Sequence, residues 1–560
     1  MDVNRRTILG GAAAFASTAA LPAAEAATRK VGGSKADATA LKALGAYVDQ
    51  HRAEWGIPGL TLAVVTRDGF DGFVASGWAD VDKRIPVGAE HLFQIGSISK
   101  MMTALAAWSL IDEGELSPDV RLSDALKGLS VRGGSGITLQ HLLNHTSGLP
   151  ADSEIFPEGG LAAGFAPGAH MSYSNSGYQL AGKIAAHAHG GLFQHCVEAR
   201  VLAPLGMTQS VGAIRVADRA RHAQGYEPAL TDRLAPRPGP MTASPWVDTD
   251  NAAGCITATA GDMARFMRFL LGLSEGKGGP VFSDETAKRF LESPVNAPNW
   301  GLGATYGNGI ARVQIDGRAY LHHTGGMVSF CSALHLDRDA GIAAFASGNV
   351  HYSLNYRPRD ITTFACKLFH ALRTNAPLPA PKPAKATLEK PERFAGVYTA
   401  ASGDAFEIVA GADFIRMRRD GRESVMQLAA ETLFSSADPD FALTGVAFDL
   451  DGEKASRAWA GAIEFARNPA GGYRPPASPD LRALAGIYDS DDRWAGPITI
   501  HARDGRLWVG NAEALTPLAG GEWRLGNDDW SPERIRFDGV INGRPHRLLF
   551  SGSPYVRRFS

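Results

Sequence analysis

Ser97 and Lys100 stand three residues apart in the stretch FQIGSISKMMTALAAW, where an apolar helix is predicted to begin. A serine hydroxyl is a weak nucleophile until a base within hydrogen-bonding reach takes its proton. Positions i and i+3 of a helix share a face, so both side chains would point into one cleft. The positive end of the helix dipole and partial burial both favour a neutral lysine amine. The pair therefore predicts a nucleophile, Ser97, and its base, Lys100.

The Ser-x-x-Lys spacing is weak evidence when it is taken alone. Ser274 and Lys277 repeat it in LSEGKGG, inside a glycine-rich loop after a predicted helix. Short motifs of this kind recur by chance in a long chain. The helix start favours Ser97 over Ser274, and the plain alternative is a serine that caps a helix beside a lysine that keeps it soluble.

A second polar group comes from PGAHMSYSNSGYQLAG, in which Tyr173 and Asn175 precede a predicted helix. A buried phenol beside an ammonium can share its proton, and an amide can orient both the lysine and a substrate carbonyl. The same Tyr-x-Asn pattern recurs at Tyr306 and Asn308. Because asparagine and glycine form turns readily, a structural turn is the alternative.

The third group is HHTGGM, at the start of a predicted strand. Strand side chains alternate, so His322 and His323 face opposite sides and only His323 shares a face with Gly325. The glycines would let a substrate acyl group lie flat against the strand, and the Gly326 N–H would complete an oxyanion hole. A hairpin turn with a capping histidine is the alternative.

The elements that must position these groups alternate between strands and helices. The patterns predict a helix over 37–55, a hairpin over 59–80, helices over 99–114, 138–148, 176–190 and 259–272, strands over 318–337 and 341–349, and a last helix over 360–372. Strands at both ends of a helical middle indicate an α/β (α+β) domain with an antiparallel sheet and a helical insertion. We assign this domain to residues 28–375.

The tail of the chain contains an internal repeat. Residues 376–391, APLPAPKPAKATLEKP, have the composition of a semi-rigid linker. FAGVY, beginning at Phe394, recurs as LAGIY, beginning at Leu484, and short alternating runs separated by Asp-Gly turns follow both. The pattern fits two small β-barrels or sandwiches, and we assign two small antiparallel β-barrel domains, over 392–475 and 476–560.

The first 27 residues read as an export signal. Arg5 and Arg6 precede an apolar, alanine-rich run, and Ala24 and Ala26 offer an Ala-x-Ala cleavage site. A membrane anchor is the alternative, but the run is too short and too weakly hydrophobic to span a bilayer. We expect twin-arginine-type export to the periplasm or the medium, and a mature protein without a membrane span.

The composition of the chain limits the classes of partner and substrate that we expect. The chain has 56 basic and 58 acidic residues among 560, a formal charge of −2, so we expect no nucleic acid and instead a small peptide, amide or ester substrate. No zinc-binding spacing is evident, and we expect no metal and no cofactor. The four cysteines, at 196, 255, 331 and 366, lie in apolar contexts that favour buried free thiols, although an exported location permits disulfides.

In order and spacing, the three groups together resemble the serine β-lactamase and penicillin-binding-protein family, in the branch of class C β-lactamases, DD-carboxypeptidases and D-aminopeptidases. The resemblance runs from about residue 41 to 372. It includes the stretches FQIGSISK, LLNHTSGLP, PGAHMSYSNSGYQLAG, LAPLGM and TATAGDMARF.

The resemblance implies a role for each group in hydrolysis through an acyl-enzyme, without a metal. Ser97 would be acylated, Lys100 would be its base, Tyr173 would relay a proton to the leaving group and Asn175 would orient the reactants. His323 would supply the electrostatic role that lysine fills in β-lactamases. The N–H groups of Ser97 and Gly326 would form the oxyanion hole, on a substrate strand that includes Thr324 and Gly325.

Departures from the family pattern bear on the substrate. A histidine at position 323 is only partly charged near neutral pH, which disfavours a β-lactamase. The catalytic domain followed by two barrels resembles the D-aminopeptidase architecture. We therefore expect a peptidase or amidase that acts beside D-amino acids, of the D-aminopeptidase or DD-carboxypeptidase type. The alternatives are an esterase or β-lactamase of the same family, a non-catalytic protein that binds cell-wall fragments, and a tail that only packs on the first domain or forms a homodimer.

Overall fold

The computed structural model describes residues 25–230, 239–292, 294–352, 356–383, 388–511 and 513–558. The predicted export signal, residues 1–27, lies almost wholly outside these described residues. Within the described ranges, no helix has the length and apolar character needed to cross a membrane.

The first domain is built on an antiparallel sheet with the strand order β1-β3-β2-β16-β15-β14-β13-β12-β11. Its strands are β1 (Ala27–Val31), β2 (Gly59–Thr66), β3 (Asp71–Asp80), β11 (Val295–Asn296), β12 (Thr305–Gly307), β13 (Ile310–Ile315), β14 (Arg318–Gly326), β15 (Cys331–Asp337) and β16 (Ile342–Gly348), and β4 (Ile85–Pro86) pairs with β3. The early hairpin joins the late strands through β2 and β16. The predicted sheet, completed by strands from both ends of the domain, is confirmed.

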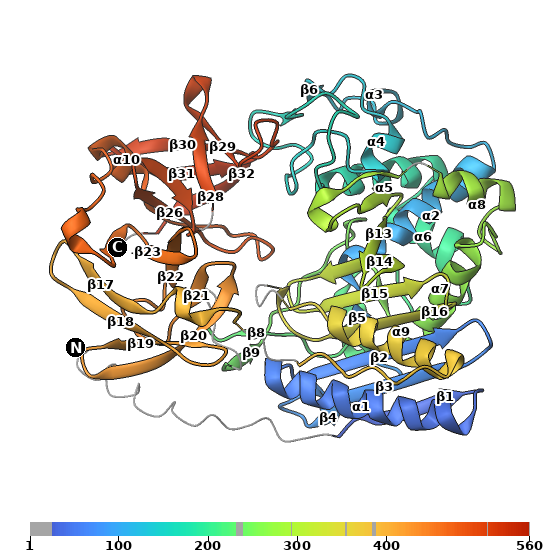
Figure 1. Cartoon of the computed structure of the whole chain (residues 1–560). Helices are drawn as coiled ribbons and strands as arrows, with labels where there is room; N and C mark the ends of the chain where they lie inside the picture. The colour runs from blue at the N-terminus through green and yellow to red at the C-terminus, as the bar shows by residue number, and fades with distance from the viewer. Residues whose placement is uncertain are drawn as a thin grey trace, which may run out of the picture.

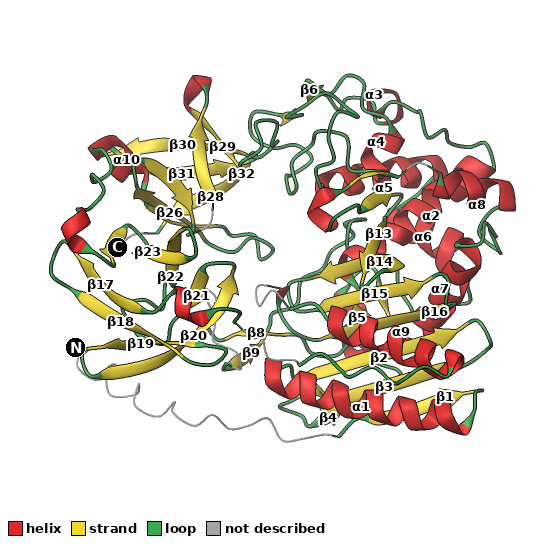
Figure 2. Ribbon diagram, in the orientation of Figure 1, coloured by secondary structure: helices red, strands yellow, loops and turns green. Residues whose placement is uncertain are grey.

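Helices cover both faces of this sheet (Figures 1 and 2). Helices α1 (Lys35–Trp55) and α9 (Arg359–Thr374) pack on one face, with Leu60, Leu62 and Val64 of β2. Helices α2 (Ser99–Asp112), α5 (Asn175–His189) and α7 (Ala260–Leu273) share a core with Ala63 and Val65 of the same strand. Strand side chains alternate between faces, so one apolar run serves both cores.

Shorter elements complete the helical insertion. They are the helices α3 (Leu122–Ala125), α4 (Leu139–Leu143), α6 (Phe193–Val197) and α8 (Asp284–Leu291) and the strand pairs β5 (Phe93–Gln94) with β10 (Thr257–Ala258), β6 (Val131–Arg132) with β7 (Leu161–Ala162), and β8 (Tyr226–Pro228) with β9 (Met241–Ala243).

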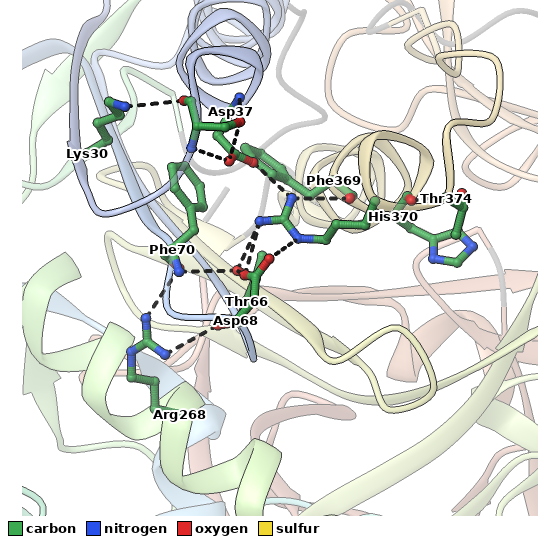
Figure 3. Close-up of polar contacts among 11 residues, drawn as sticks. Lys30, Asp37, Thr66, Asp68, Phe70, Arg268, Phe369, His370 and Thr374 are labelled. Atoms are coloured by element: carbon green, nitrogen blue, oxygen red, sulfur yellow. Dashed lines mark hydrogen bonds and ion pairs between the residues drawn. The ribbon is translucent and has the colours of Figure 1, made fainter.

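One end of the sheet is tied to three helices by charged side chains (Figure 3). Arg373 of α9 donates to Asp37 of α1 at 2.9 Å and to Asp68 in the β2–β3 turn at 3.1 Å. Arg268 of α7 donates to the Phe70 carbonyl in the same turn at 3.3 Å. These contacts fix the hairpin against the helices on both faces.

The tail forms two closed antiparallel β-barrels, as predicted. The first contains β17 (Gly396–Ala400), β18 (Ala405–Ala410), β19 (Ile415–Arg419), β20 (Arg422–Ala430), β21 (Leu433–Ser435), β22 (Val446–Asp451), β23 (Lys454–Ala460) and β24 (Ile463–Ala466). The second contains β25 (Gly486–Asp489), β26 (Ile498–Arg503), β27 (Arg506–Val509), β28 (Glu513–Pro517), β29 (Glu522–Leu525), β30 (Arg534–Ile541), β31 (Arg544–Phe550) and β32 (Ser553–Arg557), and the short helix α10 (Pro479–Leu484) precedes it. Figure 1 shows the barrels in orange and red beside the first domain.

The sequence repeat folds in the same way in both barrels. The hydroxyls of Tyr398 and Tyr488 are buried and donate to the carbonyls of Phe394 and Leu484, each at 2.8 Å. The repeated motif therefore places a tyrosine in each barrel core and binds its hydroxyl to the chain four residues earlier.

Candidate active site

Ser97 lies in a short 3-10 helix, Gly96–Ile98, that runs directly into α2. Gly96 has φ 54°, a left-handed conformation that favours glycine. A methyl group at Gly96 would lie 2.7 Å from the nitrogen of Gly326, so the backbone of this turn packs against the end of β14. This close approach brings the serine beside the strand predicted to bind substrate.

Lys100 is fully buried, and its Nζ makes three polar contacts. The distances are 2.9 Å to Ser97 Oγ, 2.6 Å to Asn175 Oδ1 and 2.9 Å to the carbonyl of Ala253. Burial lowers the pKa of Lys100 to about 7. A neutral amine has two N–H groups and one lone pair, and the amide and carbonyl oxygens can only accept. The two N–H groups therefore point at Asn175 and Ala253, and the lone pair is directed at Ser97.

The Tyr-Ser-Asn stretch is organised by the start of α5. Ser174 is the N-cap, and its hydroxyl accepts the N–H of Gly177 at 2.9 Å. Tyr173 and Asn175 flank this cap and project toward Lys100, whose Nζ lies 4.8 Å from the centre of the Tyr173 ring. The Ser97 side chain acts on the Tyr173 hydroxyl and lowers its pKa, an effect smaller than that of burial. Burial raises the pKa of Tyr173, so the phenol is protonated and can donate.

His323 on β14 is buried and neutral. Its Nε2 lies 3.1 Å from the hydroxyl of Tyr306, and its Nδ1 lies 2.6 Å from the carbonyl of Thr324. The carbonyl can only accept, so Nδ1 carries the proton and Nε2 accepts from Tyr306. Burial and nearby Lys100 hold the pKa of His323 well below 6.5. This differs from the electrostatic role that the resemblance implies, because a neutral ring supplies hydrogen bonds rather than positive charge.

The two glycines of β14 do not leave the space for a substrate that the sequence predicts. A methyl group on Gly325 would lie 2.0 Å from the carbonyl of Ile95, so the chain before Ser97 fills that space rather than a substrate. A methyl group on Gly326 would lie 2.5 Å from Nη2 of Arg357. A guanidinium therefore lies beside the N–H that is predicted to bind an oxyanion.

Several side chains in the site are not marked by the sequence motifs. Tyr306, which the sequence offers only as a repeat of Tyr-x-Asn, contacts His323 directly. His145, from LLNHTSGLP, has its ring 4.2 Å from that of Tyr173, and its Nδ1 accepts the N–H of Ser174 at 3.0 Å. Asp152 accepts from Nδ2 of Asn175 at 2.9 Å. The stretch LLNHTSGLP, which resembles the family, is the sequence signal that points to His145. No motif in the sequence points to Asp152.

The competing Ser-x-x-Lys pair has a structural role. The Ser274 hydroxyl donates to the Leu271 carbonyl at 2.7 Å, at the end of α7. Lys277 is exposed and forms an ion pair with Glu275 at 3.1 Å. The two side chains do not form a nucleophile and base.

The described part of the chain also lacks any group of three or more His, Cys, Asp or Glu side chains that could hold a metal ion. The four cysteines are buried free thiols.

Comparison with known proteins places this site in a family. The Beta-lactamase family model matches residues 44–364, more than half of the chain, and the protein belongs to that family. Together, the family and the site define a serine hydrolase.

Two curated relatives illustrate the match. The chain is 29% identical over 321 residues to Penicillin-binding protein 4 of Amycolatopsis lactamdurans. The alignment covers 53% of this chain and 82% of that protein. It is 28% identical over 222 residues to a Beta-lactamase of Escherichia coli K12, covering 38% of this chain and 56% of that protein.

Among solved structures, the chain resembles an octameric penicillin-binding protein homologue from Pyrococcus abyssi. The TM-score is 0.53 at 21% identity, over 76% of this chain and 99% of the other. A likeness at this identity supports the fold alone.

Proposed function

We propose that this protein hydrolyses peptide or amide bonds next to D-amino acids through an acyl-enzyme on Ser97. The observation that carries the proposal is the buried amine of Lys100, which lies 2.9 Å from Ser97 Oγ and has a pKa of about 7. A base with a pKa near the working pH combines the right protonation state with an adequate driving force.

The geometry supports a two-step reaction. Lys100 takes the proton of Ser97 as Oγ attacks the substrate carbonyl, and the N–H groups of Ser97 and Gly326 bind the oxyanion. The tetrahedral intermediate collapses as the leaving amine takes a proton from the Tyr173 phenol, which recovers one from the Lys100 ammonium. Water, deprotonated by the same groups, then attacks the ester carbonyl, and that proton passes to Ser97 Oγ as the ester bond breaks and the acid leaves.

The substrate class rests on architecture and location. A domain of this family followed by two β-barrels resembles D-aminopeptidases, and we propose a D-aminopeptidase or D-amidase activity. The twin arginines at Arg5 and Arg6 support export, and we propose that the enzyme acts in the periplasm or outside the cell.

A second candidate, a DD-carboxypeptidase, is favoured by Arg357. Its guanidinium lies against Gly326, at the strand where the substrate would bind. Guanidinium groups pair with carboxylates in bidentate geometry, so this side chain suits a substrate that ends in a free carboxylate.

A panel of substrates tests the proposal. D-alanine amide, N-acyl-D-Ala-D-Ala, a short-chain ester and a chromogenic cephalosporin are compared by kcat/KM, with L-alanine amide as the matched control. We expect D-alanine amide to be favoured over L-alanine amide by at least about 100-fold. Arg357→Gln should leave amide hydrolysis unchanged and lower D-Ala-D-Ala hydrolysis. Equal rates on the two enantiomers, or turnover of the ester alone, would overturn the substrate class.

A further inference from the structure

The side-chain amide of Asn175 lies between a hydrogen-bond donor, Lys100, and a hydrogen-bond acceptor, Asp152. Its Oδ1 accepts from Lys100 Nζ at 2.6 Å, and its Nδ2 donates to Asp152 Oδ1 at 2.9 Å. A carboxylate can only accept, so Asp152 forces the amide nitrogen to its own side and the oxygen toward Lys100. A flipped amide would present N–H groups to the lysine and displace the lone pair aimed at Ser97.

Asp152 belongs to a short segment, residues 150–153, that is joined to the start of α5. The carbonyl of Ala151 accepts the N–H of Asn175 at 2.7 Å. The N–H of Ser153 donates to Ser176 Oγ at 2.7 Å, and Ser174 Oγ donates to the Pro150 carbonyl at 2.6 Å. The segment and the helix start therefore move together.

The second barrel holds the same segment from the other side. The N–H of Ala151 donates to Glu533 Oε1 at 2.6 Å, and Ser153 Oγ donates to the carbonyl of Ser551 at 3.0 Å. Ser551 Oγ in turn donates to Glu533 Oε2 at 2.7 Å, so both carboxylate oxygens are used. In Figure 1 this barrel, coloured red, reaches the loops beside β6.

A continuous line of hydrogen bonds thus runs from the barrel to the nucleophile. We infer that Asp152, and Glu533 of the second barrel acting through residues 150–153, are positioning residues that orient Asn175 and aim Lys100 at Ser97. This inference rests on the proposed function, and it gives the second barrel a part in the catalytic apparatus of the first domain.

Asp152 also acts on Lys100 through its charge. Its carboxylate raises the pKa of Lys100 and opposes the larger, lowering effect of burial. The other titratable groups around the amine are Tyr173, Tyr178, His145 and His323. Burial raises the pKa of both tyrosines and lowers that of both histidines, so all four are neutral near pH 7. Removing the carboxylate would therefore lower the pKa of Lys100.

The test uses the full chain and a fluorophosphonate probe, which phosphonylates an activated serine with loss of fluoride, and the labelling rate of Ser97 is measured against pH. Asp152→Asn removes the charge but keeps an acceptor. The pH at which the labelling rate begins to fall should therefore move lower, while the maximal rate at high pH, the plateau, should stay nearly unchanged. Asp152→Ala removes both, and the plateau should also fall by about 10- to 100-fold. An Asp152→Ala profile identical to that of the unmodified protein overturns the inference.

The role of Glu533 is tested by comparison with Glu158, another residue at the interface between the second barrel and the first domain. Glu533→Ala should lower the plateau about tenfold, whereas Glu533→Gln, whose side-chain oxygen can still accept the Ala151 N–H, should restore it. Glu158→Ala is the matched control, because Glu158 lies outside residues 150–153, is 50% exposed and pairs with Arg547 of the same barrel at 2.6 Å.

Equal labelling rates for the Glu533→Ala and Glu158→Ala proteins would overturn the role of Glu533. Asp152 is exposed, so its variants decide the question even where Glu533→Ala does not fold. Failure of the proposed function has a different signature, since the unmodified protein would then be unlabelled or the Ser97→Ala protein would still be labelled.

Discussion

The lysine beside Ser97 is the residue on which the chemistry depends. An exposed lysine would be an ammonium at neutral pH, with no lone pair to offer. Burial changes this, and the two acceptors, Asn175 Oδ1 and the Ala253 carbonyl, then determine which way the lone pair points. The same spacing at Ser274 and Lys277 lacks both features, which explains why the motif alone does not identify a nucleophile.

The pH dependence of acylation follows from this residue. As the proposed base, Lys100 must be neutral, so the rate should be constant above its pKa of about 7 and fall tenfold per pH unit below it. His145 and His323 do not set this limb, because their pKa values are held well below 6.5. Stopped-flow labelling across the pH range measures the profile. A rate that stays constant down to about pH 5 would exclude Lys100 as the base.

At the scale of elements, the site depends on contacts between a turn and a strand that are distant in sequence. Gly96 and Gly325 both lack side chains where the backbone of one meets that of the other. Ser332 on β15 donates to the carbonyl of Ile95 at 2.7 Å and holds the turn from a third element. The proposed nucleophile, Ser97, is thus positioned by backbone packing as much as by its own helix.

A substitution at Gly96 tests this packing. Gly96→Ala should cost about 1–2 kcal/mol for the left-handed backbone and a further ~1–3 kcal/mol for the clash with Gly326. Gly114→Ala is the control, because Gly114 has φ 78° but nothing within 4 Å of the added methyl group. Calorimetry of the first-domain transition measures both. Equal destabilisation by the two substitutions would show that the contact with Gly326 carries no energy.

Patterns within single elements predicted most of the fold and the central pair of the site. Apolar alternation and turn residues are local signals, and the two barrels with their Asp-Gly turns follow from them. The roles of Asp152, Tyr306 and Glu533 could not be predicted, because each depends on a contact across a long separation, such as that of Glu533 with Ala151. Nor does a sequence show how deeply a histidine is buried, so His323 was expected to supply charge that its neutral ring lacks.

At the scale of the whole molecule, the second barrel is attached to the first domain beside the candidate active site. Trp530 of the second barrel stacks on His170 with ring centres 4.5 Å apart, and Arg547 pairs with Glu158. The chain after α9 also returns along α1, where the Tyr47 hydroxyl donates to the carbonyl of Lys382 at 2.8 Å. These contacts hold the second barrel and the segment after α9 on the first domain.

The cysteines offer a test of the whole structure. All four are buried free thiols, and burial raises the pKa of Cys196 and Cys331 to about 11. Thiolates are the reactive form, so the folded protein should not react with a thiol reagent, and the denatured protein should show four thiols. A count of two after denaturation without reductant would reveal a disulfide that this structure does not contain.

The most direct test of the account is the identity of the residue that a serine-directed probe modifies. The full chain is treated with a fluorophosphonate probe and digested, and the modified peptide is sequenced by mass spectrometry. We predict one adduct, on Ser97, that is lost in Ser97→Ala, greatly reduced in Lys100→Ala and unchanged in Ser274→Ala. An adduct that persists in the Ser97→Ala protein, or that forms at Ser274, would contradict the assignment of the nucleophile.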